Sequence, residues 1–354
     1  MRRRQFITFI GDALAAYPLA VDAQQSEHAR RIAVLIGVAA ALILLFGLNT
    51  GAPAQNYPDK LIKIIVPATA GGPTDVPARL ASQILPPRLG QPIVIEYWPG
   101  VGGAIGAKAV ATAAPDGYTL LAGNTSVLAV IPAVSASAGY DPVKDYLPVA
   151  KISESFQILV VRPSFPAKTL KEFIDYAKAN PGKLNYAHTG VGALPHLTAE
   201  LFKLRTVIDV VGVSYRGGAE SVTAVLSDAV HFTFESITIL LPHIRDGKLR
   251  AFGVTSRTRS PLAPDLPTIG ESGVPDYEVL TFNGIVAPAR TPAAIVNRLN
   301  AAINEGLRTE EMQTIITPLG AVTNPGTPGE FGAFIASQFE KWTAVGKAAN
   351  VKID

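Results

Sequence analysis

Three short segments concentrate glycine and small polar residues at points where a predicted strand gives way to a predicted helix. They are residues 67–75, 187–196 and 214–220. In an open parallel sheet, ligands bind beyond the carboxyl ends of the strands, where helix N-termini present unpaired N–H groups and a partial positive charge. Glycine lets the backbone approach a ligand closely. These turns therefore predict a site that holds an anion through main-chain amides, without a metal or a buried basic side chain.

Several side chains in these turns also fit a purely structural interpretation. Asp75 could serve only as a helix N-cap, or could cap the helix and also contact a ligand through water. Thr189 and Gly190 fit a ligand contact or an ordinary turn. His196 lies in the first turn of a predicted helix, where a surface position is the more common one. Arg216 fits a solvated position or one that faces a cleft.

The sequence lacks the motifs of the common enzyme classes. It contains no cysteine, which excludes disulfides, Cys-ligated zinc, iron–sulfur clusters and thiol nucleophiles. Its five histidines form no metal-binding spacing, and it has neither a nucleophile elbow nor a phosphate-binding loop. The glycine runs 100–106 and 190–195 both depart from the dinucleotide-binding pattern. We therefore expect no enzyme, no metal and no cofactor; the alternative is an enzyme that uses His188 or His196 as a base.

The first 54 residues are predicted to be an export signal. Five of the 31 Lys and Arg residues and three of the 28 Asp and Glu residues lie there, so the rest of the chain is nearly neutral. Arg30 and Arg31 precede an uncharged apolar run, 32–48, and then a small-x-small motif that ends at Ala54. This layout predicts a periplasmic protein cleaved after Ala54, with a retained membrane anchor as the alternative. The run 2–7 resembles a second, twin-arginine leader, which a wrongly assigned start codon would explain.

From residue 55 onward, short β-branched runs alternate with amphipathic helical stretches. This alternation predicts an α/β fold with mostly parallel sheets covered on both faces by helices. The predicted strands are 61–66, 92–96, 118–121, 156–161, 184–187, 207–213, 230–234, 250–254 and 279–287. The predicted helices are 75–85, 102–113, 169–179, 195–204, 218–226, 237–245, one capped by Thr291 with Pro292 at its first position, and a terminal one over 331–345.

The chain is longer than one ordinary hydrophobic core requires, so we expect two lobes. Extended crossings near 151–161 and 279–287 would form a hinge of two strands. The first lobe is then predicted to comprise residues 55–155 and 282–354, and the second lobe residues 156–281. No basic stripe with interleaved aromatic residues is present, so we expect no nucleic acid partner.

A series of short motifs, in order along the chain, resembles the substrate-binding proteins of tripartite tricarboxylate transporters, the Bug receptor family. The matching runs cover almost all of the chain after residue 57. They are residues 64–67, 71–79, 99–106, 115–121, 140–142, 179–184, 195–197, 200–202, 215–217, 247–250, 287–289 and 341–342.

The resemblance implies a type II periplasmic binding fold, with two lobes that close on a small carboxylate or dicarboxylate. It also implies delivery of that ligand to the membrane permease subunits of a tripartite transporter, and we expect a monomer. A receptor that presents its ligand to a signalling partner is the alternative. Carried over by position, the implied ligand-binding residues are Ala68, Thr69, Gly72, Asp75, Asn124, Ser126, His188, Thr189, Gly190, Gly192, Arg216 and Gly217.

The chain departs from the family pattern at several positions. Ala193 stands where Thr is usual, His188 where Ser is typical, and Glu235 where an Asp usually ends the strand. Phe282 replaces a frequent Trp. The substitutions at 188 and 193 flank the predicted pocket, so the identity of the ligand cannot be transferred from the family.

Overall fold

A computed structural model describes residues 57–70 and 74–353. The chain divides into two units, residues 1–55 and 56–354, and all described residues belong to the second. The predicted export signal and the predicted site residue Gly72 therefore lie outside the described residues. Within the described part, no helix combines the length and the apolar character needed to cross a membrane.

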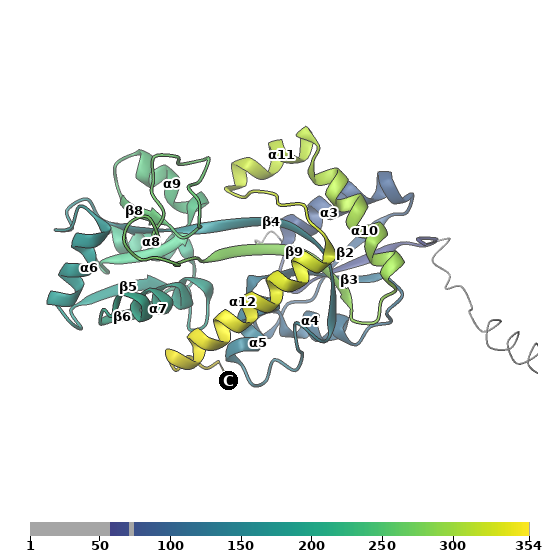
Figure 1. Ribbon diagram of the computed structural model, residues 1–354, viewed down its shortest axis with the longest axis horizontal. Helices are drawn as coiled ribbons and strands as arrows, with labels where there is room; N and C mark the ends of the chain where they lie inside the picture. The colour runs from purple at the N-terminus through teal and green to yellow at the C-terminus, as the bar shows by residue number, and fades with distance from the viewer. Residues whose placement is uncertain (1–56, 71–73, 354) are drawn as a thin grey trace, which may run out of the picture. The chain divides into compact units, whose positions relative to one another are not determined.

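Nine strands of the described residues form one sheet, and helices separate most of them, as expected for an α/β fold (Figure 1). The strand order is β2-β1-β3-β9-β4-β7-β5-β6, with β8 also paired to β4. The strands are β1 (Ile62–Val66), β2 (Ile93–Tyr97), β3 (Thr119–Asn124), β4 (Tyr146–Val161), β5 (Leu184–His188), β6 (Val210–Ser214), β7 (Phe232–Ser236), β8 (Arg250–Val254) and β9 (Leu280–Pro288).

Parallel pairing is confined to two groups of strands. β1 pairs in parallel with β2 and β3, and β5 pairs in parallel with β6 and β7. Every antiparallel pair among the described strands includes β4 or β9. We call β1, β2 and β3 the β1 group, and β5, β6 and β7 the β5 group. The expected parallel arrangement therefore holds within each group, and the long strands between the groups are antiparallel.

The strand β4 links the two groups. Its residues up to Phe156 pair with β9, and from Gln157 they pair with β7 (Figure 1). The sequence predicted a strand over 156–161 and an extended crossing near 151–161, whereas β4 begins at Tyr146. Pro148 and Lys151 interrupt the apolar run there, and the register with β9 shifts near both residues. Long-range pairing therefore extends the strand beyond what its local pattern predicts.

The helices follow the predicted alternation, with additional ones near the middle and end of the chain. The α-helices are α3 (Asp75–Leu89), α4 (Ala104–Ala111), α5 (Ile131–Val134), α6 (Leu170–Ala179), α7 (Leu194–Thr206), α8 (Gly218–Leu226), α9 (Ile237–Arg245), α10 (Ala293–Leu307), α11 (Glu310–Ile316) and α12 (Pro328–Ala348). Short turns η2 (Val101–Gly103), η3 (Ser126–Val130) and η4 (Thr317–Leu319) complete the set. The segment η3–α5 and the helix α11 were not predicted.

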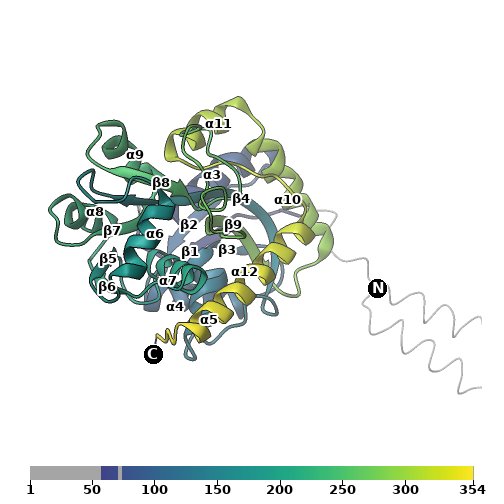
Figure 2. The same cartoon turned by 60° about the vertical axis from the view of Figure 1, so that its left-hand side comes forward.

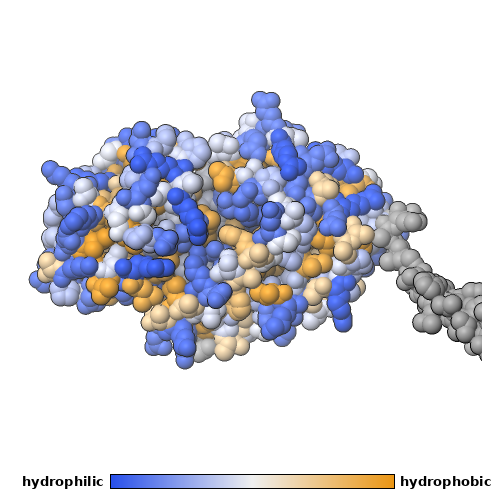
Figure 3. All heavy atoms as spheres, in the orientation of Figure 1, coloured by the Kyte–Doolittle hydropathy of each residue, from blue (hydrophilic) through white to orange (hydrophobic). Residues whose placement is uncertain are grey.

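Buried side chains connect the two groups through α12. One core cluster lies between the β1 group, α3 and α10, and includes Ile64, Ile84 and Leu299. The largest cluster includes Leu121 of β3, Phe232 of β7 and Trp342 of α12. Helix α12 contacts β4, η3, α5 and α7, and Figure 2 shows it running along the outside of these elements. Hydrophilic side chains dominate the face drawn in Figure 3, with apolar ones in smaller groups between them.

Two predicted helix starts have different outcomes. Thr169 caps α6 as predicted, because its side chain accepts the N–H of Glu172 at 3.2 Å. The predicted start of α10 is wrong by one residue: Pro292 is the N-cap and the helix begins at Ala293. Thr291 lies one residue before the N-cap, and its hydroxyl donates to the carbonyl of Pro288 at 2.8 Å.

Candidate ligand-binding site

A cavity of about 600 Å³ lies between residues of the β1 group, the β5 group and the strands that link them. Its lining is largely apolar, with hydroxyl and amide groups interspersed. The lining residues are Val76, Pro77, Leu80, Asn124, Thr125, Ser126, Ser153, Ser155, Gln157, Thr189, Leu194, Pro195, Gly218, Glu235, Ser236, Thr238, Ile239, Thr281, Asn283, Ile316 and Ala321.

Four helices begin at this cavity. The first turns of α3, α7, α8 and α9 all contribute lining residues. The first N–H groups of a helix have no partner within the helix, and the macrodipole adds a partial positive charge at the same end. None of the described lining residues is Lys, Arg or His. The arrangement is therefore suited to hold an anion through main-chain amides and hydroxyls.

Three of the predicted ligand-binding residues line this cavity: Asn124, Ser126 and Thr189. Asn124 ends β3 and joins two neighbouring elements. Its Nδ2 donates to the hydroxyl of Thr74 at 2.6 Å, and its Oδ1 accepts the N–H of Val127 at 3.0 Å. Because Thr74 is the N-cap of α3, this amide holds the start of α3 against the end of β3.

Of the residues predicted in the first turn, Ala68, Thr69 and Asp75 are described, and none of these three is among the lining residues of the cavity. Ala68 is half-buried and Thr69 is exposed. Asp75 is the first residue of α3 and is 1% exposed. Its carboxylate accepts hydrogen bonds from Nε of Arg79 at 2.9 Å and from the hydroxyl of Tyr97 at 2.8 Å. The N-cap interpretation of Asp75 is wrong, because Thr74 occupies the cap position.

Two glycines of η2 and α4 explain how the chain positions this first turn. A Cβ on Gly103 would lie 2.9 Å from the carbonyl oxygen of Pro67, and one on Gly106 would lie 3.1 Å from the Pro67 Cα. Gly103 also has a φ of +106°, which favours glycine. The glycine run 100–106, which departs from the dinucleotide-binding pattern, therefore allows α4 to pack directly against the turn after β1.

Two neutral imidazoles hold the second turn. His188 is 3% exposed, and its Nδ1 accepts the N–H of Gly190 at 3.2 Å. His196 is half-buried, and its Nδ1 accepts the N–H of Gly192 at 3.2 Å. Burial lowers the pKa of His188, and burial together with the neighbouring His188 lowers the pKa of His196 to about 4. His188, Gly190 and Gly192 thus shape the turn that presents Thr189, although they do not line the cavity themselves.

The far side of this turn packs against the end of the described chain. Gly192 has a φ of +76°, and a Cβ there would collide with the side chain of Ile353. The N–H of Ile353 in turn donates to the carbonyl of Val134 at 2.9 Å. The segment after α12 therefore contacts both α5 and the turn that carries Thr189.

The third turn, residues 214–220, contributes to the cavity lining through a glycine, which has no side chain. Arg216 is exposed, and its N–H donates to Oε2 of Glu220 at 2.7 Å. Gly217 is the N-cap of α8, with an extended backbone, and the next residue, Gly218, lines the cavity. In this structure the guanidinium of Arg216 is not part of the cavity lining.

The predicted ligand-binding residues do not include the polar lining residues that lie within β4, β7 and β9, among them Gln157 of β4, Glu235 of β7 and Asn283 of β9. Each of these three is less than one tenth exposed. Oε1 of Gln157 and Oδ1 of Asn283 have no hydrogen-bond partner among the described residues. Buried polar atoms are normally paired, so a guest or ordered water is expected to complete this site.

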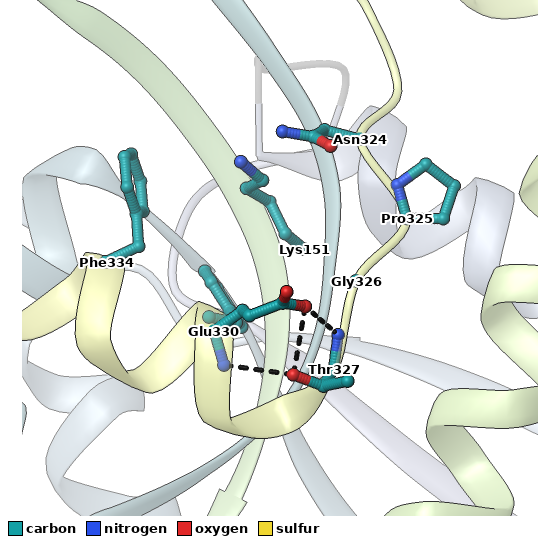
Figure 4. A pocket seen from close by; sticks show the side chains of 8 residues that line it. Lys151, Asn324, Pro325, Gly326, Thr327, Glu330 and Phe334 are labelled. Carbon is teal, nitrogen blue, oxygen red and sulfur yellow. Dashed lines mark hydrogen bonds between the residues drawn. The ribbon is translucent and has the colours of Figure 1, made fainter.

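A second hollow, of about 300 Å³, lies beside Lys151 and the start of α12 (Figure 4). Its charged groups already have partners. Nζ of Lys151 lies 2.8 Å from Oε2 of Glu154. Thr327 and Glu330 form a reciprocal capping box, with the Thr327 N–H donating to Glu330 at 2.7 Å. These groups stabilise β4 and the start of α12. In the described part of the chain, no group of three or more acidic or histidine side chains could hold a metal.

Comparison with solved structures assigns the fold to the periplasmic binding proteins. Periplasmic binding protein BugD is 32% identical with a TM-score of 0.67, covering 84% of this chain and 99% of BugD. MatC from Rhodopseudomonas palustris, solved with bound malate, is 34% identical with a TM-score of 0.68, covering 82% and 99%. An R. palustris protein solved with adipate is 32% identical with a TM-score of 0.70, covering 84% and 99%.

Sequence comparison then identifies the family. Residues 78–351 match the family described as Tripartite tricarboxylate transporter family receptor (TctC). Protein BugT of Bordetella pertussis is 34% identical over 320 residues, which cover 90% of this chain and 98% of BugT. The chain belongs to the tripartite tricarboxylate transporter receptors of the Bug type, a family of periplasmic substrate-binding receptors. The predicted family and fold class are confirmed.

Proposed function

We propose that this protein is an extracytoplasmic solute-binding protein that captures a small carboxylate or dicarboxylate in the 600 Å³ cavity. The observation that carries the proposal is the convergence of four helix N-termini on a cavity whose described lining contains no basic side chain. Amides at such ends can accept a carboxylate without a buried cation. The malate and adipate in two related structures support the same ligand class.

We also propose that the chain closes around its ligand as two lobes, residues 55–155 with 282–354 and residues 156–281. The change in the partner of β4 at Phe156 and Gln157, from β9 to β7, supports this division. The cavity is lined from both sides of that point. Small-angle scattering with and without a saturating ligand tests the closure; an unchanged radius of gyration would contradict it.

A panel of mono-, di- and tricarboxylates tests the ligand class. A ligand that binds only the folded state raises the melting temperature, so at least one carboxylate should do so. Replacing Thr189 with valine should then weaken its binding about 5- to 10-fold in calorimetry, because the variant loses one hydroxyl contact in the cavity. Thr343→Val, on the exposed face of α12, is the matched control and should bind like the wild type. A panel without any thermal shift would refute the proposed function.

Export and delivery complete the proposal. We propose cleavage after Ala54, a monomeric periplasmic protein, and transfer of the ligand to the membrane permease subunits of a tripartite transporter. The family to which the chain belongs supports this role. N-terminal sequencing of the protein from periplasmic extracts is expected to begin at Gln55, and an intact leader would contradict the cleavage. Ligand uptake by cells that carry the permease, with and without this protein, tests delivery.

A further inference from the structure

The carboxyl group of Glu235 is buried in the cavity without a cation beside it. Glu235 lies near the end of β7, is 5% exposed, and forms no ion pair within the described residues. Its Oε2 accepts one long hydrogen bond, from the N–H of Ser236 at 3.3 Å. A Cβ built on Gly218 would lie 2.8 Å from the same oxygen, so the carboxyl group sits directly against the start of α8.

The surroundings of Glu235 are built for a polar guest. Gln157 and Asn283, both less than one tenth exposed, line the same cavity and each has a side-chain oxygen without a partner. Their amide groups can present either oxygen or NH2 after a half-turn. Glu235 is the charged residue among the described lining, which otherwise offers hydroxyls, amides and apolar groups. A carboxylate that enters this cavity therefore meets an acidic side chain and no neutralising base.

We propose that Glu235 binds the guest carboxylate as a neutral acid, donating its O–H to one carboxylate oxygen, so that ligand binding takes up a proton from solvent. The inference rests on the proposed function, because it requires a carboxylate ligand. Two adjacent carboxylates cannot both remain ionised in a buried site, and a shared proton resolves the conflict. Glu235 would then provide a side-chain hydrogen-bond donor that selects for a ligand acid group at this end of the cavity.

The electrostatics of Glu235 agree with this role. Burial raises the pKa of Glu235 to about 7, and only the N–H of Ser236 opposes the shift. An incoming anion raises it further, because like charges disfavour ionisation. Below about pH 7 the free protein is already protonated there and binding needs no added proton. Above that pH the proton must come from solvent, so affinity should fall about tenfold per pH unit.

Other titratable groups on the neighbouring elements are directed elsewhere. Glu154 of β4 pairs with Lys151, and Arg162, which directly follows β4, pairs with Asp228. Glu220 of α8 accepts the N–H of Arg216. The other titratable groups on β4, β5, β8, α7 and α9 are Tyr146, Tyr186, His188, Arg250, His196, Glu200, Lys203, Arg205, His243 and Arg245; none of them contributes to the pKa shift of Glu235.

Two imidazoles and one lysine elsewhere in the protein also have shifted pKa values and matter when ligand affinity is measured against pH. The lowered pKa values of His188 and His196 keep both imidazoles neutral above about pH 7. Lys341 has a pKa lowered by burial to about 8, but its Nζ donates to the carbonyl of Glu278, and neither residue is among those that line the cavity. The wild type and Glu235→Gln both contain Lys341, so the difference between their pH profiles of binding does not depend on Lys341.

Calorimetric titration with malate and with adipate, between about pH 6 and pH 8.5, tests the proposal. In buffers of different ionisation enthalpy, the wild type should take up about half a proton per ligand near pH 7 and approach one at higher pH. Its affinity should fall about tenfold per pH unit above about pH 7. Glu235→Gln keeps a neutral donor in place, so its affinity should not vary with pH. Glu340→Gln, exposed on α12, is the matched control and should keep the wild-type slope.

The outcomes of the titration distinguish the proposed carboxylate-binding function from the proposed proton uptake by Glu235. If the wild type binds neither dicarboxylate at any pH, the proposed function fails for this ligand class and the inference fails with it. If the wild type binds with a flat pH profile and no proton uptake, the inference alone is overturned. A Glu235→Gln protein that keeps the wild-type slope would also overturn it. The proton uptake of the wild type decides the question even if that variant does not fold.

Discussion

Replacing Trp342 with alanine is expected to lower the free energy of unfolding by roughly 3–5 kcal/mol. Trp342 is 0% exposed and is among the largest fully buried side chains. It belongs to the core cluster that also contains residues of β3 and β7, so its loss leaves a cavity at the junction of the two strand groups. Denaturant unfolding followed by circular dichroism measures the change, which should lower the melting temperature by roughly 6–10 °C.

Two further variants make this prediction specific. Trp98 is 42% exposed, so Trp98→Ala should change stability by less than about 1 kcal/mol. Nε1 of Trp342 has no hydrogen-bond partner among the residues that the structure describes, so Trp342→Phe removes an unpaired buried donor along with some volume. We therefore expect Trp342→Phe to lose much less stability than Trp342→Ala. Equal losses in the two buried variants would show that packing volume does not determine the effect.

Replacing Gly284 with valine is expected to be the other severe change. Gly284 pairs with Lys151 in the β4–β9 ladder. A Cβ on Gly284 would lie 2.7 Å from the carbonyl oxygen of Ala150 and would also collide with the ring of Phe331. The ring could rotate, but the backbone oxygen cannot move without disturbing the strand pairing. We expect a loss of about 3 kcal/mol or more.

The expected consequence of Gly284→Val extends to binding. Asn283, the residue before Gly284, lines the cavity. The fraction of the Gly284→Val variant that still folds should therefore also bind carboxylates more weakly. Gly329→Val is the control, because Gly329 is exposed and a Cβ there meets its nearest neighbour at 4.0 Å. Thermal unfolding and ligand titration of both variants measure the two effects. A stable Gly284→Val protein would mean that β9 can move away from β4 at this position.

Local patterns in the sequence predicted the elements that depend on local interactions. Runs such as 61–66 and 250–254 became β1 and β8, because short β-branched segments between turns carry a clear strand signal. The long strand β4 was only partly predicted, since its first ten residues include Pro148, Lys151 and Glu154 and depend on pairing with β9. The N-cap of α10 also differs from the prediction by one residue: Thr291 lies before the cap, and its hydroxyl donates to the carbonyl of Pro288 at the end of β9.

The same distinction explains what was found of the site. Glycine and small polar residues identify a turn from neighbouring residues in the sequence alone. Asn124, Ser126 and Thr189 could therefore be selected from the sequence, and they line the cavity. Gln157 lies in the predicted strand 156–161, which otherwise looks like core, and Glu235 directly follows the predicted strand 230–234. Their place in the site follows from the β4–β7 pairing, in which Gln157 lies opposite Ser236. No local pattern contains that long-range relation.

The shared strand β4 has a consequence for how the protein folds. β7 of the β5 group pairs with β4, and β3 of the β1 group pairs with β9, which itself pairs with β4. The β5 group without β4, or the β1 group without β9, would expose a row of unpaired backbone groups. Neither group is therefore expected to be an autonomous folding unit, and residues 56–354 should melt in a single cooperative transition. Ligand that stabilises the cavity between the groups would then protect the whole body of the protein against proteolysis, including helices distant from the site.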